Sequence, residues 1–214
     1  MDTAKEVGGD FYDFYLVGES KLAFVIADVS GKGIPAAMFM MRVKTLLKSL
    51  VEGGTDLAEA FYNANNKLCE GNDAEMFVTV WMGILDVTSG RLAFVNAGHN
   101  PSAICRKGGQ FEYLKTKANL VLGMMEGIPY RMNEIALEEG DCLYLYTDRV
   151  TESQNTKEVQ FGEERLLDCL NACFHASVES SVREVCERVK EKVDGFAGDA
   201  EQADDITMLA VRFL

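Results

Sequence analysis

The sequence predicts an α+β fold with two mainly antiparallel sheets, each flanked by a pair of helices. Segments of strand length follow one another through short turns near the start and again in the middle of the chain, and short connections favour antiparallel neighbours. Two pairs of apolar-periodic segments of helix length stand apart from these strands, one pair before the middle strands and one after. The 214 residues with 48% hydrophobic content are enough for one domain with a substantial core.

The chain begins with a hairpin that brings two aspartates together. An aromatic-rich strand over Phe11–Val17 leads through a two-residue turn, Gly18-Glu19, into an apolar strand that ends at Asp28. A two-residue turn sets Asp10 opposite Ala27, one position from Asp28. The hairpin therefore holds two carboxylates close together at its open end.

A glycine loop follows this second strand. Gly31 and Gly33 permit backbone conformations that other residues avoid, and Pro35 suits the first turn of a helix. The plain interpretation of Asp28 is a carboxylate that caps a strand-to-helix turn. Because two adjacent anions repel unless a proton or a cation intervenes, a divalent metal is the alternative, and we favour it.

The remaining elements follow from periodicity and turn residues. Pro35–Val51 and Leu57–Cys69 have the helical period, with Asp56 as the N-cap of the second helix. The first of these helices has a methionine-rich face that suits packing on the sheet, or contact with a partner or a second copy of the chain. Strands are then expected at Phe77–Asp86, Arg91–Asn96, Ser102–Arg106, Phe111–Leu114, Ile135–Leu137 and Cys142–Tyr146, followed by helices at Glu163–Phe174 and Val182–Phe196 and a last strand at Ile206–Phe213.

Composition excludes several classes of function. The net charge of −13 argues against a nucleic-acid partner, which needs a basic face. No apolar run approaches the ~20 residues of a membrane helix, and no signal peptide is visible. The six cysteines show no CxxC spacing, which favours reduced core thiols and a cytoplasmic location.

Two further acidic positions match the first pair. Asp148 ends a buried strand as Asp28 does, and Asp204-Asp205 begins one as Asp10 does. In an antiparallel sheet the end of one strand lies beside the start of its neighbour, so we expect these carboxylates to meet at one edge. Oxygen ligands suit Mg²⁺ or Mn²⁺, and several carboxylates can hold two ions ~4 Å apart. Each aspartate alone is better explained as a strand-end cap, but that explanation weakens when the aspartates are considered together.

Six motifs in order give the chain a specific resemblance. It is similar to the metal-dependent PPM-type serine/threonine phosphatases, and within them to the SpoIIE-like branch that includes RsbU-type regulators of bacterial stress responses. The motifs cover nearly the whole chain and read EVGGDFYD at Glu6–Asp13, DVSGKGIPAAMF at Asp28–Phe39, NAGHNP at Asn96–Pro101, LYTD at Leu145–Asp148, FGEERLL at Phe161–Leu167 and DDIT at Asp204–Thr207.

The resemblance implies an αββα sandwich that binds two Mn²⁺ or Mg²⁺ ions. It implies that Asp28 bridges both ions, that the Val29 carbonyl is an added ligand, and that Asp10, Asp148 and Asp204 complete the shell, with Asp205 less certain than its neighbour. The catalytic residues would then be Asp28, Asp10 and Asp148, acting through a metal-activated water. The implied substrate is a phosphoserine or phosphothreonine on a small STAS-domain regulatory protein.

Three positions need separate comment. His99 is expected to order its loop without touching substrate. Arg149 stands where the family has glycine, so it would strain the backbone if a glycine-only conformation were required, bind the substrate phosphate, or weaken metal binding as a competing cation. Only Met1 to Lys5 precede the first motif, where the family has another strand, so the chain is expected to be a single phosphatase domain that lacks this strand and any sensor region.

These observations leave three functions to compare. The leading one is a metal-dependent phosphoserine/phosphothreonine protein phosphatase. The alternative is a pseudophosphatase that binds a regulatory partner, motivated by Arg149 and the short N-terminal segment. A two-metal hydrolase of small phosphoesters is weaker, because the motifs match the protein phosphatases throughout.

Overall fold

The computed structural model describes residues 1, 8–116, 119–175, 181–198, 200 and 204–214. These residues form two units, each with its own sheet and helices. The N-terminal unit comprises Lys5–His99 and Thr116–Leu137, and the C-terminal unit comprises Met1–Ala4, Asn100–Lys115 and Glu138–Leu214.

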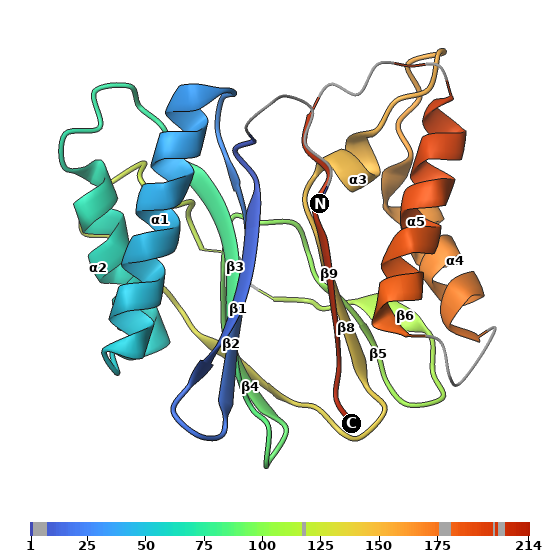
Figure 1. Ribbon diagram of the computed structural model, residues 1–214, viewed down its shortest axis with the longest axis horizontal. Coiled ribbons are helices and arrows are strands. Elements are labelled where there is room, and N and C mark those ends of the chain that lie inside the picture. Colours follow the sequence, from blue (N-terminus) through green and yellow to red (C-terminus); the bar gives the residue numbers. More distant parts are fainter. Residues whose placement is uncertain (2–7, 117–118, 176–180, 199, 201–203) are drawn as a thin grey trace. The chain divides into compact units, whose positions relative to one another are not determined.

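The N-terminal unit contains a five-stranded sheet in which every neighbouring pair is antiparallel (Figure 1). Short turns join β1 to β2 and β3 to β4, which is why these neighbours in sequence are also neighbours in the sheet. The order is β1 (Phe11–Val17), β2 (Lys21–Val29), β3 (Val78–Asp86), β4 (Arg91–Ala97) and β7 (Asn133–Ala136).

The register of the first hairpin differs by one residue from the sequence prediction. Val17 pairs with Lys21, so the turn contains Gly18, Glu19 and Ser20 instead of two residues. Gly18 has φ +69° and so accommodates the reversal in the left-handed region. Turn length fixes the register of a hairpin, and the longer turn shifts every pair by one.

Two helices cover one face of this sheet (Figure 1). Helix α1 spans Ile34–Glu52, and α2 spans Leu57–Cys69. The Asp56 carboxylate accepts hydrogen bonds from the backbone N–H groups of Ala58 and Glu59, which confirms the predicted N-cap. The apolar stripes of both helices pack on alternate residues of the strands to form the core of the unit.

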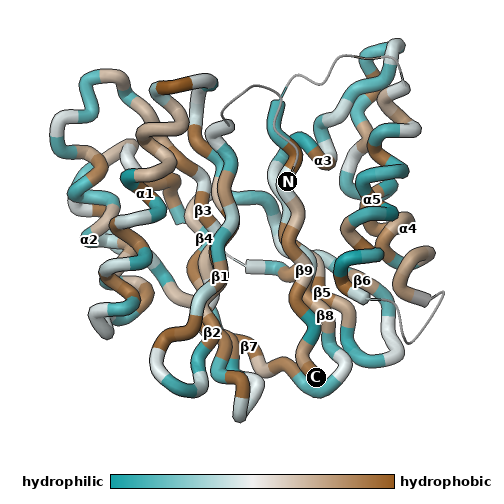
Figure 2. The backbone as a smooth tube through the Cα atoms, in the orientation of Figure 1, coloured by the Kyte–Doolittle hydropathy of each residue, from teal (hydrophilic) through white to brown (hydrophobic). Residues whose placement is uncertain are grey.

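Aromatic rings stack in a row across the strands of the same sheet. Trp81 lies between Phe24 and Phe94, with ring centroids 5.4 and 5.0 Å apart. Their neighbours along the strands, such as Val25 and Met82, belong to the helix-facing core, so the alternation of strand side chains puts the rings on the other face. Figure 2 shows the hydrophobic character concentrated along the strands.

The C-terminal unit contains a four-stranded antiparallel sheet and three helices. Its order is β6 (Phe111–Tyr113), β5 (Ala103–Cys105), β8 (Cys142–Tyr146) and β9 (Met208–Arg212). The helices are α3 (Arg149–Glu152), α4 (Gly162–His175) and α5 (Val182–Ala197), and α4 and α5 pack on the sheet. Ser181 and Glu184 form a capping box at the start of α5.

A buried carboxylate fastens one end of this second sheet. Asp141 accepts hydrogen bonds from the backbone N–H groups of Lys107 and Glu138, and it forms an ion pair with Arg106 at 2.6 Å. Burial alone would raise the pKa of Asp141, but these hydrogen bonds and the guanidinium outweigh burial and hold it below its ordinary value. The charged form of Asp141 therefore stabilises the turn before β8.

The predicted fold class is confirmed: the protein is α+β, with two mainly antiparallel sheets and a helix pair against each. Of the predicted elements, β1, α2 and β8 have the predicted bounds, and the others differ by one or two residues at their ends. The short helix α3 was not predicted. None of the helices among the described residues combines the length and apolar character that a membrane span requires.

Candidate metal centre

The N-terminal unit brings Asp10 and Asp28 to one end of its sheet. Phe11 pairs with Ala27, and the same register extended by one residue sets Asp10 directly opposite Asp28. Asp10 is only 3% exposed, while Asp28 is half-buried. Opposite residues of an antiparallel pair have side chains on the same face, so the observed register brings the two carboxylates closer than the predicted one.

The Val29 carbonyl lies beside this pair. A Cβ built on Gly9 would come within 3.1 Å of the Val29 oxygen and 3.4 Å of the Ala36 Cβ. A side chain at position 9 would crowd the end of β2, so glycine suits this close approach. The Val29 oxygen thus lies near the residue that precedes Asp10, and carbonyl and carboxylate oxygens are both hard donors.

The loop after β2 has the glycine geometry that the sequence predicted. Gly31 and Gly33 have φ +85° and +75°. Ser30 extends the pairing of β2 with β3, because its N–H donates to the Phe77 oxygen and its Oγ accepts from the Phe77 N–H, both at 2.9 Å. The end of β2 is thus fixed by hydrogen bonds before the chain enters α1.

The NAGHNP loop is held by its own side chains and reaches back to β3. Asn96 accepts a hydrogen bond from the His99 N–H at 2.8 Å and donates to the His99 oxygen at 3.0 Å. The His99 ring is 6% exposed, and its Nδ1 lies 2.8 Å from the Thr79 Oγ1. Thr79 pairs with Asp28 in the register of β2 and β3. The Asn96 side chain thus holds the loop, and the His99 ring connects the loop to β3. That His99 does not touch substrate stays a prediction.

The C-terminal unit contains the second pair of aspartates, again at neighbouring strand ends. Beyond the pairing of Tyr146 with Met208, Thr147 and Thr207 exchange two further hydrogen bonds of 3.0 and 3.1 Å. Asp148 comes directly after Thr147, and Asp204 lies four residues before Met208, where β9 starts. The Asp204 carboxylate accepts from the Asp205 N–H at 3.0 Å, and Asp205 is the more buried of the two.

Arg149 does not have the backbone conformation that the sequence prediction considered. It is the first residue of α3, its carbonyl accepts hydrogen bonds from Ser153, and it is not among the residues with positive φ. The suggestion that Arg149 strains a glycine-only position is therefore wrong, because the short helix provides an ordinary conformation. Burial and the charge of Asp148 raise the pKa of Glu152 in the same helix, and the charge of Arg149 opposes them.

The donor set fits a hard divalent cation, although neither unit supplies a complete site. In the part of the chain that the structure describes, no three His, Cys, Asp or Glu side chains are grouped closely enough to hold a metal ion. Each unit instead supplies two aspartates from adjoining strand ends, and the N-terminal unit adds the Val29 carbonyl. The two pairs belong to different sheets, so the expectation that all four meet at the edge of one sheet is wrong. A meeting of all four aspartates across two sheets remains a prediction.

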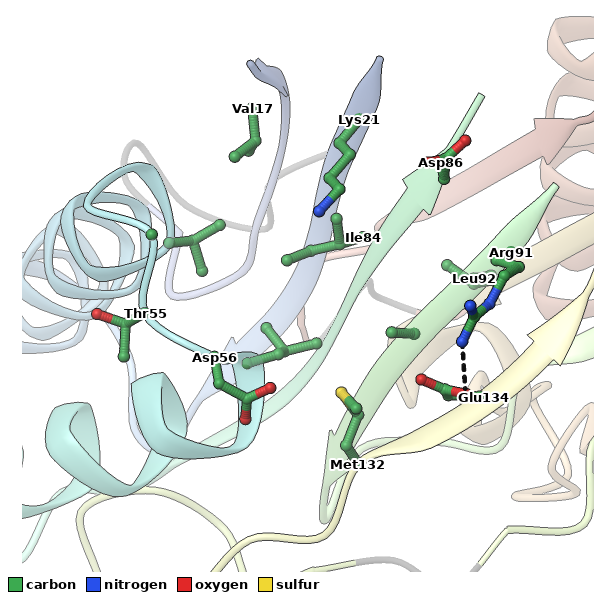
Figure 3. Close-up of a pocket in the computed structure, with 14 residues that line it drawn as sticks. Val17, Lys21, Thr55, Asp56, Ile84, Asp86, Arg91, Leu92, Met132 and Glu134 are labelled. Carbon is green, nitrogen blue, oxygen red and sulfur yellow. Dashed lines mark hydrogen bonds and ion pairs between the residues drawn. The ribbon is translucent and has the colours of Figure 1, made fainter. Parts of the chain in front are cut away.

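A cavity of about 420 Å³ lies at the other end of the N-terminal sheet (Figure 3). Lys21 lines it at the start of β2, about seven residues and roughly 23 Å along the strand from Asp28. Its acidic residues have structural roles: Asp56 caps α2, Asp86 accepts from two turn N–H groups, and Glu134 forms an ion pair with Arg91 at 3.2 Å. The cavity is thus separate from Asp10 and Asp28 of the same unit.

Sequence reasoning missed Thr79 as a residue of this site. The hydroxyl becomes relevant only through the pairing of β3 with β2, and the two helices α1 and α2 separate these strands in sequence. The position of Thr79 at the start of a strand was the available signal, but without the register it could not be connected to Asp28.

The fold and the two pairs of strand-end carboxylates define the class of metal-dependent PP2C-type phosphatases. The model of the family described as "Stage II sporulation protein E (SpoIIE)" matches residues 18–214, so the chain belongs to this family.

Two relatives are similar over almost the whole chain. The protein IcfG of Synechocystis is 32% identical over 99% of this chain and 37% of its own length. The phosphoserine phosphatase RsbU of Bacillus subtilis is 32% identical over 98% of this chain and 60% of its own length. The chain thus spans less than two thirds of either relative.

Solved structures show the same fold at lower sequence identity. The SiaA PP2C domain of Pseudomonas aeruginosa matches 100% of this chain and 84% of its own with a TM-score of 0.85 and 24% identity. The PP2C domain of SpoIIE from Bacillus subtilis matches 97% of this chain and 59% of its own with a TM-score of 0.80 and 23% identity. RsbX, solved in complex with magnesium, matches 98% of this chain and 90% of its own with a TM-score of 0.69 and 13% identity.

Proposed function

We propose that this chain is a metal-dependent phosphatase that hydrolyses phosphoserine or phosphothreonine on a small STAS-type regulatory protein. The observation that carries the proposal is the register that sets Asp10 opposite Asp28 beside the Val29 carbonyl. It is supported by the membership of the SpoIIE family and by the similarity to a relative named as a phosphoserine phosphatase.

In this proposal Asp10, Asp28, Asp148 and Asp204, with the Val29 carbonyl, hold two Mn²⁺ or Mg²⁺ ions. The bound ions would lower the pKa of a water molecule and neutralise charge on the phosphoryl oxygens. Asp28 has the central role, because it lies on β2, which is paired with β1 on one side and with β3 on the other. Tight placement of a ligand is what makes such a site effective.

Arg149 has the role of a substrate ligand in the proposed function. A guanidinium presents a planar pair of donors that matches two phosphate oxygens. Helix α3 begins immediately after Asp148, so Arg149 lies next to a proposed metal ligand in sequence. We also propose a cytoplasmic location, supported by the absence of disulfides among the six cysteines.

The test is phosphate release from a phosphorylated STAS-domain protein, measured with and without Mn²⁺. We expect release that depends on the metal and is lost in Asp28→Ala. The matched control is Asp13→Asn, because Asp13 is in the same hairpin but forms an ion pair with Lys44 at 3.3 Å on the helix-facing side. The control should retain the activity of the wild type.

The alternative function is that of a pseudophosphatase that binds the same kind of partner without hydrolysis. Its specific motivation is the charge of Arg149, since the backbone strain is absent. A wild-type protein that binds the phosphorylated partner but releases no phosphate at any Mn²⁺ or Mg²⁺ concentration would favour it and contradict the proposed enzyme.

A further inference from the structure

We propose that Thr79 and His99 are positioning residues that hold the end of β2, and so the Asp28–Val29 pair of ligands, through one chain of hydrogen bonds. This inference rests on the proposed function, since it concerns the same ligands. All of its residues lie in the N-terminal unit, and all of its distances are within that unit.

The chain of hydrogen bonds begins at a loop that is held rigidly. The Asn96 side chain makes two hydrogen bonds to the backbone of His99, and its own carbonyl accepts from Asn119 through both the backbone N–H and the side-chain amide. Gly98 has φ +69°, and a Cβ there would meet Val121 at 2.4 Å. The His99 ring is therefore presented to β3 from a fixed backbone.

The Thr79 hydroxyl connects this ring to β2. It lies 2.8 Å from His99 Nδ1 and makes a longer contact of 3.5 Å to the Asp28 carbonyl oxygen, to which it donates. A hydroxyl has one proton, so both contacts are hydrogen bonds only when His99 Nδ1 carries a proton and donates to Thr79. The proposed chain of hydrogen bonds therefore requires the Nδ1–H form of His99.

The consequence for the proposed metal ligands is geometric. The Asp28 carbonyl belongs to the peptide that leads to Val29, so a contact at this oxygen restrains both residues. The backbone at Gly9 passes close to the Val29 oxygen, and the Thr79 hydroxyl contacts the Asp28 oxygen from β3. A valine at position 79 would keep the shape of the side chain but leave the buried Nδ1–H of His99 without this acceptor.

The experiment is a calorimetric titration of the full chain with Mn²⁺ alone. Outer-shell substitutions typically weaken metal affinity by 10–100-fold, and we expect about a 10-fold rise in Kd for Thr79→Val. Thr79→Ser, which keeps the hydroxyl, should bind close to the wild type. The matched control is Thr88→Val, the same change at an exposed turn of the same sheet, which should not alter Kd.

His99 is tested by two amide substitutions of different length. His99→Asn places an amide N–H near the position of Nδ1 and should retain most of the affinity, whereas His99→Gln should not. In the double variant Thr79→Val/His99→Gln the losses should be less than additive, because both changes interrupt the same chain of hydrogen bonds. Circular dichroism and urea unfolding verify that each variant folds.

Nitrogen NMR of the His99 ring gives a readout that needs no metal. The wild type should show the Nδ1–H form, and Thr79→Val should change the Nδ1 shift. The positioning role is overturned if Thr79→Val binds Mn²⁺ as tightly as the wild type, or if His99 is protonated at Nε2 only. A wild type that binds no Mn²⁺ refutes the proposed function itself and the positioning role with it.

Discussion

The substitution Gly98→Ala should destabilise the N-terminal unit by about 2–5 kcal/mol. Gly98 has φ +69°, a conformation that costs a residue with a Cβ about 1–2 kcal/mol. The new methyl group would also lie 2.4 Å from the Val121 Cγ1, and overpacking of this kind costs about 1–3 kcal/mol. The expected loss is the sum of these two contributions.

Gly18→Ala separates the two contributions. Gly18 has the same φ of +69°, but an added Cβ would have no heavy atom within 4 Å, so only the backbone contribution of about 1–2 kcal/mol is expected. Removing the obstacle with Val121→Ala in the Gly98→Ala background should recover part of the overpacking cost.

Urea unfolding followed by tryptophan fluorescence is the assay, because Trp81 is the single tryptophan and is fully buried in the sheet of this unit. Gly98→Ala should have the lower midpoint of the two alanine variants. Equal loss of stability in Gly98→Ala and Gly18→Ala would refute the claim that Val121 closes the space beside Gly98.

Three other predictions concern the C-terminal unit. The pKa of Asp141 is lower in the folded protein than in the unfolded chain, so its stabilising effect is complete above the unfolded pKa and is lost as the pH falls through the folded pKa. The substitution Asp141→Asn should therefore lower the free energy of unfolding by about 1.5–3 kcal/mol in urea at pH 7 and make stability less sensitive to acid. The control Glu139→Gln should have neither effect. The substitution Arg149→Gly relieves no backbone strain and should lower the free energy of unfolding by about 0.5–1 kcal/mol. Calorimetric titration with Mn²⁺ of the wild type, Arg149→Gly and Arg149→Met separates the effect of the charge from that of the backbone. Equal Mn²⁺ affinities in these three proteins would remove the hypothesis that Arg149 weakens metal binding. Burial raises the pKa of the Cys142 and Cys169 thiols to about 12, so both should react with a disulfide reagent at pH 8 far more slowly in the native protein than in urea. Fast labelling of either thiol in the native protein would contradict its burial.

The elements of the fold could be predicted from local signals. The Asp56 cap and the periodic stripe that follows it define α2, and an unbroken apolar run defines β8. Both signals lie within the element that they predict. Helix α3 has only four residues and no apolar stripe, so nothing in its composition distinguishes it from a loop.

The register of the first hairpin was beyond the same local signals. Gly18 marks the turn, but the sequence does not say whether Ser20 belongs to the turn or to the strand. The structure assigns Ser20 to the turn, and its carbonyl accepts a hydrogen bond from Val87 on the neighbouring hairpin. A contact with the turn after β3 thus accompanies a register that the sequence of the first hairpin alone left open.

The candidate ligands illustrate how far strand pairing can carry a functional prediction. Antiparallel pairing was enough to predict that Asp10 lies near Asp28, although one residue out of register, and that Asp148 and Asp204 lie near neighbouring strand ends. Each of these statements concerns two strands of one sheet. The meeting of the two pairs depends on how separate sheets pack, for which a single sequence has no comparable rule. The Mn²⁺ affinities of Asp10→Asn and Asp148→Asn therefore test whether the two pairs of aspartates form one metal centre. Comparable losses of Mn²⁺ affinity in both variants indicate one shared centre. A loss of affinity in only one variant indicates that the two pairs act separately.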